Sequence, residues 1–135
     1  DISVALADQA AAAALHFCRG KGWRVSASVV DRDGVLKAMQ RADGAGPHTV
    51  DASRQKAYTA VSAHNSTSAM LEMIQKNPAA ANLSMIDGFL ILGGGLPIRV
   101  GDTVIGAIGV GGAPGGQFDE QCAQAGIDKI SDRLK

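Results

Sequence analysis

Apolar residues recur every three to four positions at the start of the chain, which is the period of a helix with one buried side. Alanine, the strongest helix former, fills many of the positions between them. Gly20 and Gly22 then end the pattern as glycines commonly end helices. We therefore predict a helix over Ile2–Arg19. Its buried stripe consists of Ile2, Leu6, Ala10, Ala13 and Phe17.

The next segment changes to a period of two. From Arg24 to Asp31, apolar residues alternate with serines, as in a strand with two different faces. Residues 31–34 supply turn chemistry, because Gly34 can adopt a positive φ without strain. The strand pattern resumes over Val35–Arg41. Arg24–Arg41 is therefore predicted to form an antiparallel hairpin.

A second helical pattern begins at Thr49, after a loop rich in glycine. The polar run Ser62–Ser68 predicts a break in it, with Ser66 capping a short following helix. Asn77 and Pro78 end that helix. The apolar side of the pattern consists of Val50, Ala57, Val61, His64 and Leu71.

The last third of the chain predicts three more strands and a helix. Phe89–Leu92 is short and fully apolar, while Ile98–Val100 and Thr103–Val110 form a hairpin around a Gly-Asp turn. Gln117–Lys135 has acidic residues at its start and basic ones at its end, as suits a helix dipole. Five strands with short connections, bracketed by helices, predict a single α+β domain over residues 1–135 with an antiparallel sheet.

Composition narrows the class of partner. The chain has 135 residues, of which 46% are hydrophobic, enough for the core of one domain. Its 13 basic and 13 acidic side chains cancel, which disfavours a nucleic-acid binder. No run of 18 apolar residues occurs, so no membrane span is predicted. We expect a small-molecule partner or another copy of the chain, and the compartment stays open between cytoplasmic and secreted or periplasmic.

Most of the 17 glycines lie between Gly93 and Gly116. The segment lacks the GxGxxG spacing of dinucleotide-binding turns and the GxxxxGK of phosphate loops. Glycines within strands mark bulges, bends or close backbone approach. The pattern leaves open whether that approach serves the fold, a flat ligand or a partner subunit.

The two cysteines, Cys18 and Cys122, lie far apart in sequence and form no CxxC or zinc motif. Both fall in helix-like segments among alanines. This context favours two buried free thiols over one long-range disulfide.

Three histidines are candidates for metal or cofactor chemistry. His16 flanks the first apolar stripe, where a neutral imidazole can ligate a metal or haem iron. The ordinary alternative is a surface histidine at a helix C-terminus. His48 is placed in a loop, and His64 is expected to be a hydrogen-bonded core residue. No two histidines stand four apart, so no zinc pair is predicted.

Polar residues interrupt the second helix at Arg54, Lys56 and Thr59. A cation there can meet a propionate, phosphate or carboxylate, or can belong to a solvated face. Tyr58 can stack on a ligand or pack in the core. No pattern typical of a catalytic nucleophile occurs, so no catalytic residue is predicted.

Five motifs together resemble the GlcG/HbpS-like family of small haem-binding proteins, and are similar to the C-terminal domain of PduO-type cobalamin adenosyltransferases. They are SVVDRDGVL (28–36), KAYTA (56–60), GGLPI (94–98), GAIGVGG (106–112) and DEQCAQAG (119–126). The resemblance implies a profilin-like fold with a five-stranded antiparallel sheet flanked by helices. It also implies a homo-oligomer and, in some members, haem binding. Two positions depart from the family pattern: Val35 stands where histidine is frequent, and Gly111 where serine is frequent.

The resemblance makes a haem-binding protein the leading hypothesis. His16 would ligate the iron, Lys56 or Arg54 would pair with a propionate, and Thr59 joins the cofactor-binding candidates through the KAYTA motif. Whether any reaction is catalysed stays open.

Two alternatives accompany this hypothesis. One is a small-molecule enzyme or accessory protein of a catabolic operon, acting on an organic acid or ring compound through Lys56, Tyr58 and His64. The other is a structural oligomeric module that binds no ligand.

Overall fold

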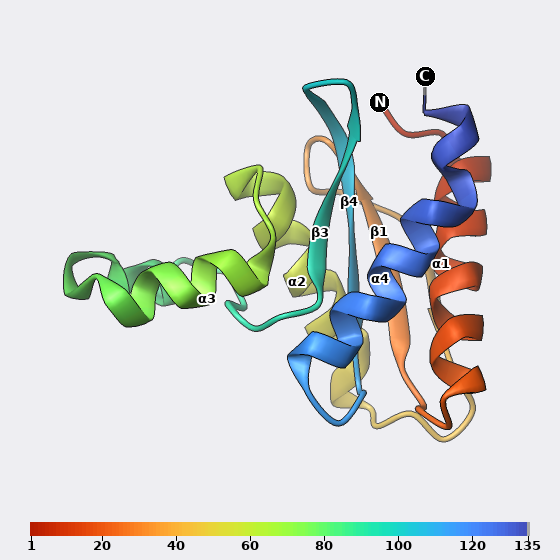
Figure 1. Cartoon of the computed structure of the whole chain (residues 1–135), viewed down its shortest axis with the longest axis horizontal. Coiled ribbons are helices and arrows are strands. Elements are labelled where there is room, and N and C mark those ends of the chain that lie inside the picture. Colours follow the sequence, from red (N-terminus) through yellow and green to blue (C-terminus); the bar gives the residue numbers. More distant parts are fainter. Residues whose placement is uncertain (135) are drawn as a thin grey trace.

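A computed structural model describes residues 1–134 and shows an antiparallel sheet with helices on both faces (Figure 1). The four strands lie in the order β2-β1-β4-β3. They are β1 (Ser26–Asp31), β2 (Leu36–Arg41), β3 (Gly95–Val100) and β4 (Thr103–Gly111). The helices are α1 (Val4–Gly20), α2 (His48–Ala63), α3 (Thr67–Lys76) and α4 (Gly116–Ile130), with short 3₁₀ helices η1 (Pro78–Met85) and η2 (Ser131–Arg133). The predicted α+β class is confirmed.

The prediction of a fifth strand at residues 89–92 is wrong for the part of the chain that the structure describes. The backbone N–H of Leu90 donates to the Thr59 hydroxyl of α2, 2.9 Å away, and not to a neighbouring strand. An apolar run of four residues cannot by itself distinguish a strand from a segment packed across a helix. The sheet therefore ends at β3, where Pro97 lies on an edge and its missing N–H costs no ladder bond.

One face of the sheet is covered by α1 and α4, which lie side by side (Figure 1). The Ser3 hydroxyl accepts a hydrogen bond from the N–H of Leu6 and so caps the start of α1. The buried alanines of α1 pack with Val29, Ile98 and Ile108 of the sheet in the larger of two apolar clusters. The predicted helix is thereby confirmed, but the predicted buried stripe is wrong in part, since Leu6, Ala13 and Phe17 are only half-buried. The buried side consists of Ala7, Ala10, Ala11, Ala14 and Cys18, because these small residues allow close approach of the sheet and α4.

The opposite face is covered by α2 and is more polar. Ser26 and Ser28 of β1 are fully buried, and their hydroxyls bond those of Thr49 and Ser53 at 2.8 and 2.7 Å. Both faces of β1 are thus buried, although its sequence alternates between apolar and polar residues. Hydroxyl pairs satisfy these buried serines where an exposed strand would use water.

The predicted break after α2 is confirmed, with one change. α2 ends at Ala63, and the capping residue His64 has a left-handed φ of 53° and an exposed side chain. His64 is therefore not the core histidine that the helical pattern suggested, because the helix stops one residue before it. The Ser66 hydroxyl caps α3 by accepting from the N–H of Ala69. α3 and the following segment extend away from the sheet as an arm (Figure 1).

The expectation of two free thiols is wrong in the structure. Cys18 of α1 and Cys122 of α4 form a disulfide, with their Cα atoms 5.6 Å apart. The prediction failed because a helical pattern in sequence does not reveal which helices become neighbours. The disulfide now ties the two helices of one face together.

The predicted C-terminal helix is shorter than its pattern, since α4 ends at Ile130 and η2 follows; Lys135 lies outside the described residues. Within residues 1–134, no helix has both the length and the hydropathy needed to cross a lipid bilayer.

Candidate functional site

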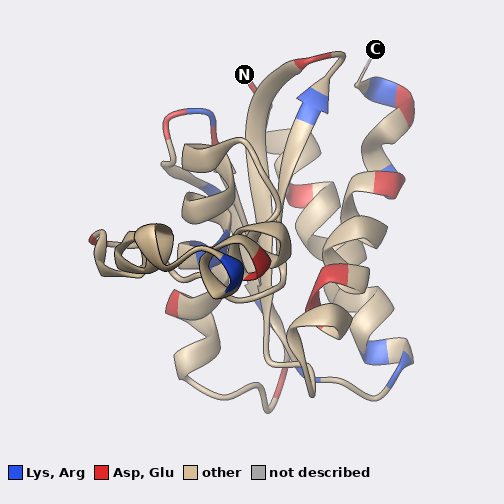
Figure 2. Cartoon of the chain, turned by 60° about the vertical axis from the view of Figure 1, so that its left-hand side comes forward, with Lys and Arg blue, Asp and Glu red and all other residues tan. Residues whose placement is uncertain are grey.

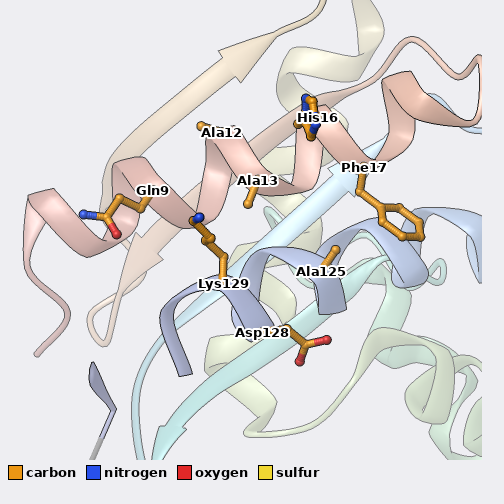
Figure 3. Close-up of a pocket in the computed structure, with 8 residues that line it drawn as sticks. All are labelled: Gln9, Ala12, Ala13, His16, Phe17, Ala125, Asp128 and Lys129. Atoms are coloured by element: carbon orange, nitrogen blue, oxygen red, sulfur yellow. The ribbon is translucent and has the colours of Figure 1, made fainter. Parts of the chain in front are cut away.

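A surface cavity with a volume of about 650 Å³ lies between α1 and α4. This α1–α4 groove is lined by Gln9, Ala12, Ala13, His16, Phe17, Ala125, Asp128 and Lys129 (Figure 3). Volumes of about 300–1,000 Å³ are typical of small-molecule sites. The groove is therefore large enough for a ligand of cofactor size.

Small residues and the disulfide bring the two walls of the groove together. A Cβ atom at Gly126 of α4 would meet the carbonyl oxygen of Ala10 at 2.6 Å, so the helices approach closely there. The Cys18–Cys122 bond joins them directly after Phe17. Figure 3 shows Ala13 and Phe17 pointing from α1 toward α4. The walls are thus mostly apolar and are fixed by a covalent link.

His16 is the histidine that lines this groove, and it is exposed. Its Nδ1 lies 3.2 Å from Nη2 of Arg19. Arginine can only donate, so Nδ1 must accept this hydrogen bond and the proton of the neutral ring sits on Nε2. Ligation of iron through Nε2 would require the other tautomer, which the Arg19 contact opposes.

The groove also carries charge on its α4 wall. Figure 3 shows Lys129 reaching from α4 toward α1 and Asp128 turned away from it. Asp128 accepts a hydrogen bond from Nε2 of Gln124 at 2.8 Å, whereas Lys129 forms no ion pair among residues 1–134. A cation without a carboxylate partner beside an apolar wall suits a ligand that is apolar with an acidic edge.

The predicted residue Lys56 lies elsewhere, on the floor of a second cavity of about 470 Å³ between α3 and the start of α4. Its Nζ donates to Oδ2 of Asp119 at 3.0 Å and to the carbonyl oxygen of Val110 at 2.9 Å. Both charged side chains are only 5% exposed. Burial raises the pKa of the Asp119 carboxyl, while the Lys56 ammonium and the N–H of Ala113 partly offset that rise. Lys56 thus joins α2 to α4 and is largely committed within the protein.

Thr59 and Arg54 do not line either of these cavities. The buried Thr59 hydroxyl donates to the carbonyl of Gln55 and accepts from the N–H of Leu90. Arg54 is half-exposed, with Nε 3.6 Å from Oδ1 of Asp51. The four predicted cofactor-binding residues are therefore not brought into one site, since His16 stands apart from the three residues of α2.

The alternative set Lys56, Tyr58 and His64 is not assembled either. Tyr58 packs edge-on against Phe89, with ring centroids 6.1 Å apart. The His64 carbonyl accepts a bond from Arg99, and its side chain is exposed at the end of α2. His48 is exposed at the start of α2. Within residues 1–134, no group of three or more His, Cys, Asp or Glu side chains could hold a metal ion.

Sequence reasoning missed the α4 half of the groove. Ala125 and Lys129 stand four positions apart, as do Ala12 and His16, so each set shares one face of its helix. This spacing was the available signal. It could not reveal that the two faces meet, because that depends on the packing of helices about 100 residues apart in sequence.

Comparison with known proteins agrees with this fold. A family model described as "Haem degrading protein HbpS-like" matches residues 2–128. The protein GlcG of Escherichia coli is 33% identical over 109 residues, covering 81% of this chain and 80% of GlcG. The crystal structure of a double mutant of Streptomyces reticuli HbpS is 39% identical, covering 94% of this chain and 85% of that one, with a TM-score of 0.89.

A third relative is the crystal structure of a PduOC–haem complex, which is 23% identical with a TM-score of 0.85. It covers 96% of this chain and 94% of that one, and shows a likeness of fold. The family match spans nearly the whole chain, and the sequence identities to GlcG and HbpS agree with it. The chain belongs to the HbpS-like family.

Proposed function

We propose that the protein binds haem in the α1–α4 groove, with His16 as an axial ligand of the iron. The observation that carries this proposal is an exposed imidazole that lines a mostly apolar cavity of about 650 Å³. The family description names haem, and the PduOC structure is a haem complex, which makes haem the ligand class to test first.

The residues of the groove fit the parts of a haem molecule. Ala12, Ala13 and Ala125 offer a wall without bulky side chains, and Phe17 can contact the edge of the macrocycle. Lys129, which has no carboxylate partner among residues 1–134, is the cation best placed to pair with a propionate. We therefore propose Lys129, in place of Lys56 or Arg54, as the partner of a propionate.

The groove leaves the second axial position free of this chain's own strong ligands. No second histidine, and no cysteine or methionine, lines it within residues 1–134. Bound haem would supply an iron centre whose redox state and ligand affinity depend on His16 and on the polarity of the groove. A role in haem capture, storage or redox sensing needs an accessible iron, and this open side is compatible with it.

A haemin titration followed by absorbance tests the proposal. Wild type should bind haemin saturably with a shifted Soret band. His16→Ala should weaken binding by at least about tenfold and change the spectrum. His48→Ala removes an exposed histidine outside the groove and should behave as wild type. Identical spectra and affinities for wild type and His16→Ala would refute the assignment of His16, and absence of saturable binding in wild type would refute haem binding altogether.

We also propose that the chain forms a homo-oligomer through the arm that follows α2. The arm exposes large apolar side chains: Met73 is 42% exposed, Met85 77%, Ile86 45% and Leu92 48%. A concentration of exposed apolar residues on one projecting element is typical of a surface that another chain covers.

Light scattering coupled to gel filtration tests this assembly. Met85→Glu combined with Ile86→Glu should lower the particle mass. Val35→Glu, at an exposed apolar position in the turn between β1 and β2, is the control and should leave the mass unchanged. A monomeric wild type would contradict the proposal.

A further inference from the structure

A third hollow, which neither proposal uses, lies where α1 ends and meets the start of β1 and the end of β2. It has a volume of about 250 Å³ and is lined by Arg19, Arg24 and Arg41, together with Trp23 and Gln40. Figure 2 shows Lys and Arg positions gathered at this end of α1, away from both chain termini. We refer to these residues as the arginine hollow.

The three guanidinium groups of the hollow are not neutralised by the protein. None of them forms an ion pair within residues 1–134. One carboxylate, that of Asp43, lines the same hollow without pairing to them. The hollow therefore carries a local excess of two positive charges, although the formal net charge of the whole chain is zero.

The backbone holds the three arginines on different elements. Arg19 lies in the last turn of α1. Arg41 ends β2, where its backbone pairs with that of Ser26 in β1. Arg24 packs over Gly44, and a Cβ atom at that glycine would meet its Nη1 at 2.9 Å. Three exposed arginines from separate parts of the fold thus line one hollow, which differs from a row of cations along a single helix.

We propose that the arginine hollow binds a compact anion with several charged oxygens, of the phosphate or polycarboxylate class. Guanidinium groups bind such oxygens through paired N–H donors, and Gln40 offers a neutral polar group beside them. The ring of Trp23, held 4.9 Å from the ring of Phe118, forms an apolar side of the hollow. The small volume favours a compact anion over a polymer such as nucleic acid, which the neutral chain also disfavours.

The arginine hollow meets the α1–α4 groove at Arg19. Arg19 is one of the residues that line the hollow, and its Nη2 contacts Nδ1 of His16, which favours the tautomer that opposes iron ligation. An anion that draws Arg19 into the hollow would free Nδ1. Anion binding should then strengthen haem binding, and haem should strengthen anion binding by the same factor. This coupling rests on the haem proposal, whereas the anion site does not.

Calorimetric titration of the haem-free protein at low ionic strength tests the site, with pyrophosphate as one probe and citrate as the other. Arg24→Gln and Arg41→Gln should each weaken binding about tenfold, since each removes charged hydrogen bonds. Arg32→Gln is the matched control, because Arg32 lies by Asp1 at the opposite end of α1. It should change affinity less than about twofold. Preference for one probe identifies the anion class.

Several outcomes would overturn the proposal. One is the absence of saturable binding by either probe. Another is equal weakening by Arg32→Gln and Arg41→Gln, which would indicate general surface electrostatics. Circular dichroism of each variant confirms that a loss is not a folding defect. His16→Ala should keep anion binding, so failure of the haem proposal leaves this test intact. Absence of any pyrophosphate effect on haemin affinity in a wild type that binds both ligands would refute the coupling alone.

Discussion

The two faces of the sheet are covered in different ways. The α2 face is joined by buried polar contacts, including two hydroxyl pairs and the Lys56–Asp119 ion pair. The α1–α4 face is joined by alanine packing and a disulfide, and carries the groove on its outer side. Polar side chains on the first face are buried with partners within the protein, whereas His16 and Lys129 on the second are exposed.

This contrast distinguishes polar residues that stabilise the fold from polar residues that are free to bind a ligand. A buried polar group must be satisfied or it destabilises the fold. Within residues 1–134, every buried side-chain nitrogen and oxygen has a hydrogen-bond partner. A conspicuous polar residue in a helix such as α2 can therefore serve the fold alone, while binding is better sought where charged groups lack partners.

The largest effect is expected from breaking the buried ion pair. Lys56→Met leaves Asp119 charged and buried, and should lower the free energy of unfolding by about 3–5 kcal/mol. Lys76→Met is the matched control. The Lys76–Glu72 distance is also 3.0 Å, but the two side chains are 75% and 65% exposed. Its cost should stay below about 1 kcal/mol. Urea unfolding measures both, and equal costs would contradict the structural role of Lys56.

The free energy of unfolding of Lys56→Met should also depend on pH, in a direction that the pKa of Asp119 determines. Burial already raises the pKa of Asp119 in the folded protein. A raised folded pKa means that this carboxyl destabilises the fold as the pH rises through it. Lys56→Met removes the opposing cation and raises that pKa further. The stability deficit of Lys56→Met should therefore shrink between pH 7 and pH 5, and a deficit that grows on acidification would contradict this account.

The next effect should come from the other face. Replacing both Cys18 and Cys122 with alanine removes a link between residues 104 positions apart. Loss of such a disulfide typically costs about 2–5 kcal/mol. The double variant and wild type in reductant should unfold at the same temperature, and both should unfold at a lower temperature than oxidised wild type. Unchanged stability in reductant would favour the free thiols expected from sequence. Haemin affinity should also fall, because the walls of the groove are no longer linked.

A smaller loss is expected where α2 meets β4. A Cβ atom at Gly109 would overlap the carbonyl oxygen of Ser53, so Gly109→Ala must push the helix off the sheet. Overpacking of this kind costs about 1–3 kcal/mol. Gly111→Ala, two residues along the same strand, has its nearest neighbour 3.5 Å away and should be tolerated. Similar unfolding midpoints for both variants would show that the close contact of α2 with β4 can relax.

Local patterns predicted most of the fold. The helix α1, the hairpin around Gly34 and the cap at Ser66 are determined by residues close in sequence, and all appear in the structure, although α1 buries a different side from the predicted stripe. Residues 89–92 were assigned wrongly because their backbone is satisfied by Thr59, which lies 31 positions from Leu90. Gly109 illustrates what glycine in a strand signals here, namely the close approach of a helix.

The candidate site was predicted only in part. His16 was identified because it flanks a stripe on its own helix. Lys129 and the disulfide depend on the pairing of α1 with α4, which no local pattern encodes. Lys56 was selected for its charge, but its partner Asp119 lies 63 positions away. The sequence thus identifies polar residues that could bind a ligand. Only the packing of the elements determines which of them already pair with another residue of the protein.

The smallest predicted effect tests whether the His16 side chain on the α1–α4 face is free to ligate iron. The Arg19 guanidinium donates to Nδ1 of His16 and keeps the proton on Nε2. Arg19→Ala should let the proton move to Nδ1, so that Nε2 can ligate iron without first breaking this contact. The hydrogen bond from Arg19 to the neutral imidazole contributes only a modest free energy against ligation. Its removal should therefore raise haemin affinity by roughly threefold. Arg133→Ala, another exposed arginine near the groove, is the control and should not raise it. A fall in haemin affinity with Arg19→Ala would instead mean that Arg19 contacts the ligand itself, and that the groove and the arginine hollow form one site.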